Sequence, residues 1–273
     1  MDTTRMIVLA VLAIVSFISL FFLWRWLYGD YDTSDYVIYS SIKDGLPAKD
    51  KTPTIYKGSQ VPQIYSGGEY SISTWIYVTN WTINKGKNKP FLVLSGGAPE
   101  STGFMTLVMY LGQFTNKLGI RVSTDGSLLS GDLTFARDYN AIVTGVSPYT
   151  DSAPDFKKCD IEQVDLQKWV NITAVLTGRT IDIYIDGKLS RSCLLEGLFK
   201  VDGETPTIKL GGPDGFGGII GKTTAANFAY SPDKVYTNYQ MGPFSSYSIF
   251  TLFDDLSLDV KSRGQSIFNI GAS

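Results

Sequence analysis

The stretch Trp169-Val-Asn-Ile-Thr-Ala-Val-Leu-Thr-Gly-Arg-Thr-Ile-Asp-Ile-Tyr-Ile-Asp-Gly-Lys188 decides the fold. Aliphatic residues alternate with other residues before and after the pair Gly178-Arg179, which turns the chain, and Asp186-Gly187 turns it again. Alternation with a period of two between turn residues is typical of a β-hairpin with one buried face. The residues expected on that face are Val170, Ile172, Ala174, Leu176, Ile181, Ile183 and Ile185.

Similar segments lie upstream of this hairpin. Residues 70–78, 91–94, 104–111 and 119–123 are rich in Val, Ile, Tyr and Thr and are bounded by turn residues. Repeated strands with hardly any helical pattern predict an all-β, antiparallel two-sheet sandwich. One helix is expected over residues 231–242, because Ser231 suits the N-cap, Pro232 the first turn and Gly242 the stop. Its expected buried face comprises Val235, Tyr236 and Tyr239.

Composition excludes several function classes. The 273 residues include no histidine, which removes Ser-His-Asp and Cys-His catalysis and imidazole metal sites. Lys and Arg number 24 against 26 Asp and Glu, so there is no net basic charge to attract nucleic acid. We therefore expect no nucleic-acid partner.

The N-terminal segment predicts a membrane anchor. Residues 6–24, from Met6 to Trp24, carry no charge and would span roughly 28 Å as a helix, close to the thickness of a bilayer core. Arg25 and Trp26 follow, and this bulky aromatic end resembles an interfacial belt and would be a poor cleavage site. A retained single-pass anchor over residues 1–28 is favoured over a cleaved signal peptide or a buried helix. Lys and Arg are equal in number on the two flanks, so orientation is not predicted.

Three further regions follow the anchor. Residues 29–64 form a polar stalk that leads into the domain, residues 65–243 the sandwich, and residues 244–273 a tail. The tail contains large apolar residues that a solvated segment does not need, so we expect it to dock on a neighbouring subunit. The docking candidates are Ile249, Phe250, Leu252, Phe253, Ile267 and Phe268.

Cys159 and Cys193 enclose the hairpin. A disulfide between them would close a loop of about 35 residues and stabilise the fold by roughly 3–4 kcal/mol. The alternative is two buried free thiols. We favour the disulfide.

Two blocks of this sequence resemble a known family. Trp169 opening a strand, then Tyr184 with Asp186-Gly187-Lys188 at a strand end, resembles the pattern of concanavalin A-like, laminin-G-like jelly rolls. The second block is Gly215-Phe216-Gly217-Gly218-Ile219-Ile220, followed by Ala229-Tyr-Ser-Pro232 and Gly242-Pro243. Its order resembles the close of jelly-roll proteins of large DNA viruses of algae and protists. The resemblance covers about residues 65–243, and it departs from the family at the glycine-rich residues 217–223.

The resemblance implies a structural virion protein. Such a minor capsid component would link the protein shell to an underlying membrane, with lipid and capsid or other virion proteins as partners. It would be a single-pass membrane protein of the virion, at the interface of inner membrane and capsid, or of a host membrane. The alternative is a membrane-displayed, lectin-like module that binds glycans, for which 16 tyrosines and five tryptophans offer stacking surfaces.

Catalysis and cofactors are not expected. Glycosidases among the jelly-roll relatives carry a Glu-x-Asp-x-x-Glu strand that this chain lacks, and Asp182 and Asp186 are predicted roughly 13 Å apart, too far for a catalytic pair. Laminin-G-like domains often hold Ca²⁺ through rim aspartates, but solvated or turn-capping side chains are the favoured interpretation here. The aspartates concerned are Asp151, Asp155, Asp160, Asp186 and Asp214.

Two short motifs remain. Gly221-Lys222-Thr223 resembles the end of a phosphate-binding loop. Such a loop needs a glycine at position 216, which is occupied by Phe216, so a β-turn is favoured. Asn80-Trp-Thr82 and Asn171-Ile-Thr173 match the N-glycosylation sequon. Asn171 is predicted in mid-strand, whereas Asn80 is near a strand end and is the better candidate. Either would require lumenal exposure.

Overall fold

A computed structural model describes residues 12–23, 35–41, 45–95, 105–124, 138–146, 159–201, 205–244, 258–262 and 265–270, the last two ranges by backbone alone. The chain divides into two units, Met1–Thr33 and Ser34–Ser273. In the first unit, residues 12–23 are helical. Among the described residues, no helix is long and apolar enough to cross a membrane. Four residues of the predicted anchor, Met6, Trp24, Arg25 and Trp26, lie outside the described residues.

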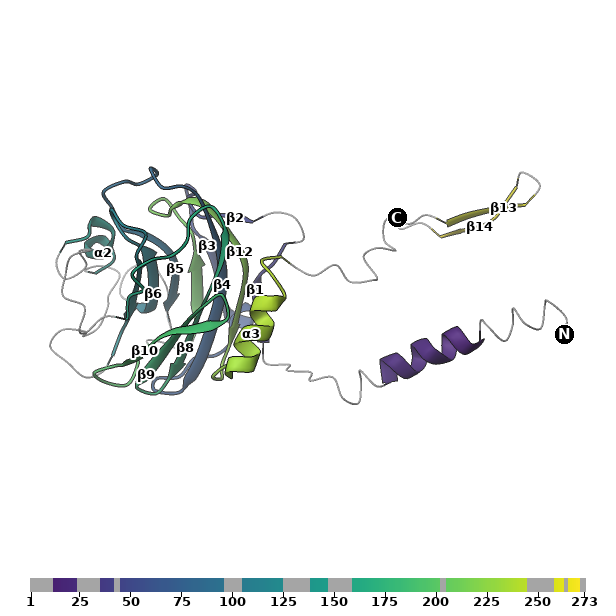
Figure 1. The fold of residues 1–273 in the computed structure, drawn as a ribbon, viewed down its shortest axis with the longest axis horizontal. Helices are drawn as coiled ribbons and strands as arrows, with labels where there is room; N and C mark the ends of the chain where they lie inside the picture. The colour runs from purple at the N-terminus through teal and green to yellow at the C-terminus, as the bar shows by residue number, and fades with distance from the viewer. Residues whose placement is uncertain are drawn as a thin grey trace. The chain divides into compact units, whose positions relative to one another are not determined.

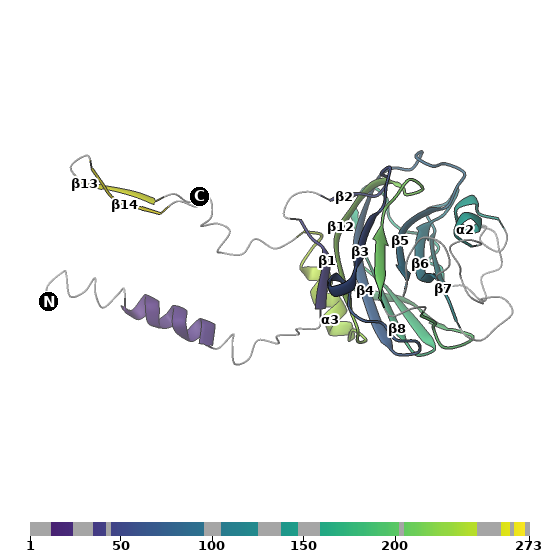
Figure 2. The same ribbon diagram turned by 180° about the vertical axis from the view of Figure 1, so that it is seen from behind.

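The second unit contains an antiparallel β-sandwich of two sheets (Figures 1 and 2), which confirms the predicted all-β, two-sheet architecture. The seven-stranded sheet has the order β1-β12-β4-β8-β9-β10, with β2 also on β12. Its strands are β1 (Asp35–Tyr39), β2 (Leu46–Pro47), β4 (Glu69–Asn80), β8 (Trp169–Thr177), β9 (Thr180–Ile185), β10 (Lys188–Leu194) and β12 (Gly217–Ala226).

The five-stranded sheet has the order β3-β11-β5-β6-β7. Its strands are β3 (Thr54–Lys57), β5 (Lys89–Ser95), β6 (Met105–Leu111), β7 (Leu118–Val122) and β11 (Thr207–Leu210). Strands β1 and β3 come from the stretch predicted as a stalk leading into the domain, and each pairs with a strand from the C-terminal part of the sandwich. The sandwich therefore brings residues 35–57 and 207–226 together.

The hairpin that decides the fold forms as predicted. Strands β8 and β9 pair with Ile172 opposite Ile185 and Leu176 opposite Ile181. Their aliphatic face is part of the core between the two sheets, where Ile172 and Ile183 are fully buried. The β9–β10 turn has positive φ at both Asp186 (50°) and Gly187 (76°). This is the backbone of a type I′ turn, which an Asp-Gly pair favours.

The β-turn predicted at residues 221–223 is not observed. Gly221-Lys222-Thr223 is not a β-turn but lies inside β12, where the pairing register with β4 shifts between Ile220 and Thr223. The glycines of the second family-like block allow close backbone contacts. A Cβ atom would lie 1.8 Å from the Ala48 carbonyl oxygen at Gly215 and 2.1 Å from that of Tyr77 at Gly218. Phe216 between them is fully buried and meets Phe91 edge to face at 5.8 Å.

A helix covers the outer face of each sheet (Figures 1 and 2). Helix α2 (Asn140–Thr144), which the sequence did not predict, packs on the five-stranded sheet through Ile142. Helix α3 (Pro232–Gln240) packs on the seven-stranded sheet through Val235. The Ser231 hydroxyl accepts a hydrogen bond from Lys234 N at 3.2 Å, so the predicted N-cap is confirmed.

The prediction for the buried face of α3 was wrong at one residue. Val235 is fully buried, but Tyr236 is 47% exposed. Successive residues turn by about 100° around a helix, so Val235 and Tyr239 share a face that Tyr236 leaves.

The predicted docking tail is described only in part. Strands β13 (Leu258–Ser262) and β14 (Gln265–Ile270) form a two-stranded hairpin, and β14 contains Ile267 and Phe268. Ile249, Phe250, Leu252 and Phe253 lie outside the described residues.

Candidate binding site on the outer face of the seven-stranded sheet

A small pocket lies on the outer face of the seven-stranded sheet. It is lined by Ser73 and Trp75 of β4, Lys222 and Thr224 of β12, and Asn238 of α3. The alternation of β12 places Lys222 and Thr224 on this face, because Thr223 between them points inward and bonds the Thr74 hydroxyl at 2.8 Å. The pocket has room for about one water molecule.

Two nitrogen donors line this pocket without an oxygen acceptor in the described part of the chain. The Lys222 ammonium donates to the thioether sulfur of Met241 at 3.7 Å, a weak acceptor. The Asn238 Nδ2 amide nitrogen is buried and has no hydrogen-bond partner among the residues that the structure describes. A buried donor without an acceptor costs free energy, so an oxygen atom in this pocket would stabilise the site.

Burial sets the electrostatics of Lys222. Desolvation lowers the pKa of its ammonium group, the charge of Lys234 acts in the same direction, and the carboxylate of Asp35 opposes both. Asp35 is itself paired with Lys234, at 2.6 Å between Oδ2 and Nζ. The local charge therefore includes two lysines and one aspartate, which favours an anionic ligand.

The walls of the pocket are held by packing and hydrogen bonds. The Trp75 indole stacks on the Tyr239 ring, with centroids 5.6 Å apart and planes inclined by 16°. The Ser73 hydroxyl accepts hydrogen bonds from Asn171 Nδ2 at 3.1 Å and from the Thr173 hydroxyl at 2.8 Å. These contacts join α3, β4 and β8, so the lining side chains are positioned by regular elements rather than by loops.

An aromatic cluster continues beside the pocket. Trp169 meets Tyr77 at 5.4 Å and Phe244 at 5.2 Å between ring centroids. The backbone N–H of Lys222 donates to the Pro243 carbonyl oxygen at 2.7 Å. Pro243 and Phe244, at the predicted boundary of the tail, therefore pack on the sandwich next to the pocket.

The residues of the first family-like block shape this face but do not line the pocket. Tyr184 is buried beneath α3 and packs with Val235. Asp186 accepts a hydrogen bond from Asn171 N at 2.8 Å, and Gly187 lies beneath the rings of Tyr236 and Tyr239. Lys188 is exposed at the start of β10. The motif therefore builds the turn on which α3 rests.

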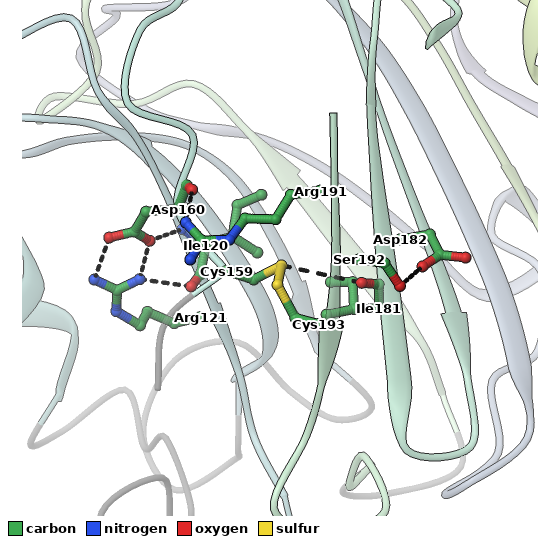
Figure 3. Close-up of a disulfide and its surroundings, with 9 residues drawn as sticks. All are labelled: Ile120, Arg121, Cys159, Asp160, Ile181, Asp182, Arg191, Ser192 and Cys193. Atoms are coloured by element: carbon green, nitrogen blue, oxygen red, sulfur yellow. Dashed lines mark hydrogen bonds and ion pairs between the residues drawn. A yellow bond between two sulfur atoms is a disulfide. The ribbon is translucent and has the colours of Figure 1, made fainter. Parts of the chain in front are cut away.

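The predicted disulfide is confirmed. Cys159 is bonded to Cys193 of β10, with a Cα–Cα distance of 5.9 Å. Figure 3 shows the ion pair of Asp160 and Arg121 on one side of this bridge and the bonded pair Asp182 and Ser192 on the other. This region is a structural clamp, because the disulfide and the ion pair join segments that are distant in sequence.

The two aspartates nearest the disulfide are bonded to other side chains. Asp182 is bonded to Ser192, and Asp160 to Arg121 and Lys117. No cluster of three or more acidic or cysteine side chains suited to a metal ion occurs among the residues described. Asp151 and Asp155 lie outside them.

Similarity to known proteins is found among solved structures alone. No protein-family model matches the sequence, and no curated protein matches it. Among solved structures, the chain is similar to a botulinum neurotoxin serotype D binding domain, with a TM-score of 0.45 and 13% identity over 76% of this chain and 45% of that one. It is also similar to the CBM40 domain of a Ruminococcus gnavus IT-sialidase bound to alpha2,3 sialyllactose, with a TM-score of 0.45 and 12% identity over 74% of this chain and 99% of that one. At these identities the likeness concerns the fold alone.

Proposed function

We propose that this protein is a non-enzymatic, lectin-like binding domain held at a membrane by its N-terminal apolar segment. In this proposal the sandwich is a concanavalin A-like, laminin-G-like jelly roll, and its ligand is a glycan that binds around Lys222. The observation that carries the proposal is the pair of donors, Lys222 Nζ and Asn238 Nδ2, which line one pocket without an oxygen acceptor in the described part of the chain.

The chemistry of the pocket indicates the kind of ligand group. Sugar hydroxyl and carboxylate oxygens accept hydrogen bonds from ammonium and amide groups, and a charged donor makes the stronger bond. The pocket has room for about one water molecule, so a ligand would place a single oxygen there while its ring lies on the surface outside. A glycan that carries a carboxylate therefore fits the site better than a neutral one.

Glycan-array binding of the full-length protein in detergent tests this proposal. We expect acidic glycans to bind, and Lys222→Gln or Asn238→Asp to weaken binding by about tenfold or more, because the first replaces the charged donor by a shorter neutral amide and the second replaces the amide donor by a carboxylate. Lys85→Gln, which changes an exposed lysine in the turn after β4, is the matched control and should bind as the unmodified protein does. An array without bound glycans, or unchanged binding by Lys222→Gln, would contradict the proposal.

The membrane and virion assignments are proposals from the sequence. Anchoring rests on the uncharged run over residues 6–24. A structural role in a virion, linking the capsid to an underlying membrane, rests on the family resemblance and on the apolar residues of the tail. Retention of the protein on intact virions after detergent stripping of external membrane would support that role.

A further inference from the structure

The two glycosylation sequons of the chain have opposite environments in the structure. Asn80 is exposed at the end of β4. Its side-chain oxygen accepts hydrogen bonds from Thr82 N at 2.8 Å and from the Thr82 hydroxyl at 2.7 Å. This compact Asx turn lies at the surface, and both bonds use Oδ1, so neither engages Nδ2, the atom that a glycan modifies.

The second sequon is closed to modification in the folded protein. Asn171 is fully buried in β8, and its Nδ2 donates to the Ser73 hydroxyl at 3.1 Å. Thr173 of the same sequon is also fully buried. The fold therefore separates two motifs that are equivalent in sequence.

The disulfide adds an independent observation about the compartment. Disulfides form and persist in oxidising surroundings such as the secretory lumen and the cell exterior, and they are rare in the cytosol. The bridge between Cys159 and Cys193 is in the same domain as Asn80. The bridge therefore favours an oxidising compartment for this domain, and the secretory lumen, where N-glycosylation takes place, is one.

We propose that Asn80 is an N-glycosylation site and that the β-sandwich faces the lumen or the cell exterior. Asn80 Nδ2 attacks the anomeric carbon of a lipid-diphosphate-linked oligosaccharide, which the host transferase supplies. The new C–N bond forms as the C–O bond to the diphosphate breaks. The lipid diphosphate leaves with the bonding electron pair, and Nδ2 loses one proton. The positive-inside rule does not distinguish the two flanks of the apolar segment, whereas this site orients the chain with its N-terminus in the cytosol.

Expression of the full chain in eukaryotic cells tests the proposal. Digestion with peptide-N-glycosidase should increase the electrophoretic mobility of the protein. Enzymatic release in heavy-oxygen water should label the peptide that contains Asn80 and leave the peptide that contains Asn171 unlabelled. Thr82→Ser keeps the sequon and should keep the glycan, whereas Thr82→Ala and Asn80→Gln should lose it.

Both parts of the proposal have a contrary outcome. An unmodified Asn80 in membrane-inserted protein, or a glycan at Asn171 instead, would overturn the assignment of the site. Protease treatment of intact microsomes tests separately on which side of the membrane the sandwich lies. The sandwich should be protected until detergent is added, and digestion without detergent would show that it faces the cytosol.

Discussion

The buried carboxylate of Asp160 accepts a hydrogen bond from the Arg121 guanidinium of β7, with Oδ2 and Nη2 3.2 Å apart. Asp160 follows directly after Cys159, whose disulfide reaches β10 of the other sheet. Ile161 then forms a backbone bridge to Leu118 of β7. Three consecutive residues therefore tie the edge strands of the two sheets together at one end of the sandwich.

Removing the charge of Asp160 should destabilise the domain. The carboxylate is 1% exposed and is also 3.1 Å from the Lys117 ammonium. Asp160→Asn removes the buried charge that pairs with the partly buried Arg121 and Lys117, so we expect a loss of about 3 kcal/mol in the free energy of unfolding. Urea denaturation followed by tryptophan fluorescence measures this change. Asp165→Asn breaks an exposed pair with Lys168 and should cost less than about 0.5 kcal/mol. Equal effects of the two variants would contradict the clamp.

The same carboxylate should make stability depend on pH in acid. Burial raises the pKa of Asp160, but the Arg121 guanidinium, the Ile120 N–H and the Lys117 ammonium outweigh burial and hold it below its ordinary value of 3.8. A group with a lowered folded pKa contributes stability that is complete above the unfolded value and is lost as pH falls through the folded one. We therefore expect unfolding titrations between about pH 5 and 2 to show a steeper loss in the unmodified protein than in Asp160→Asn.

The disulfide should stabilise the domain by reducing the conformational entropy of the unfolded chain. It spans a sequence separation of 34 residues, for which the loop-entropy model gives about 3–4 kcal/mol. The double variant Cys159→Ser with Cys193→Ser should lose this amount in urea denaturation, and non-reducing peptide mapping should find the linked peptides in the unmodified protein. Alkylation of both thiols without prior reduction would show that the bridge is absent.

The sequence predicted the sandwich more completely than it predicted the site. Alternation in the β8–β9 hairpin follows directly from burial of one face, so residues such as Ile172 and Ile183 could be assigned without the structure. Strand β12 was missed because its glycines carry no alternation signal. They are required where Gly218 passes the Tyr77 carbonyl, a contact between segments far apart in sequence. Lys222 and Asn238 line one pocket because α3 packs on the seven-stranded sheet, and no local sequence motif indicates that arrangement.

Two tyrosines of α3 should contribute differently to the stability of the domain. Tyr239 stacks on Trp75, whereas Tyr236 is 47% exposed. Tyr239→Ala removes a stacked aromatic pair and buried area and should cost about 2 kcal/mol. Tyr236→Ala should cost less than about 1 kcal/mol. Thermal unfolding of the two variants separates these expectations, and a larger effect of Tyr236→Ala would contradict the assignment of Tyr239 to the buried face.

The end of the folded domain can be located by truncation. Pro243 accepts a hydrogen bond from Lys222 N, and Phe244 packs on Trp169, so both belong to the sandwich. Truncation after Phe244 should leave the unfolding midpoint unchanged. Truncation after Gly242 removes both contacts and should cost about 1–3 kcal/mol.

The tail beyond Phe244 should be needed for association with assembly partners and not for folding of the sandwich. In the β13–β14 hairpin Leu258 is opposite Ile270 and Val260 is opposite Phe268. A two-stranded hairpin is marginally stable in water alone, and this one pairs apolar residues, so we expect it to pack on a further surface. We expect the chain truncated after Phe244 to remain folded and membrane-bound but to lose association with its assembly partners, measured by co-purification. The paired substitution Val260→Lys with Phe268→Lys should have the same effect, and Asp259→Asn, which changes a polar residue of the same strand, should have none. Unfolding of the sandwich on truncation after Phe244 would show instead that the tail belongs to the core.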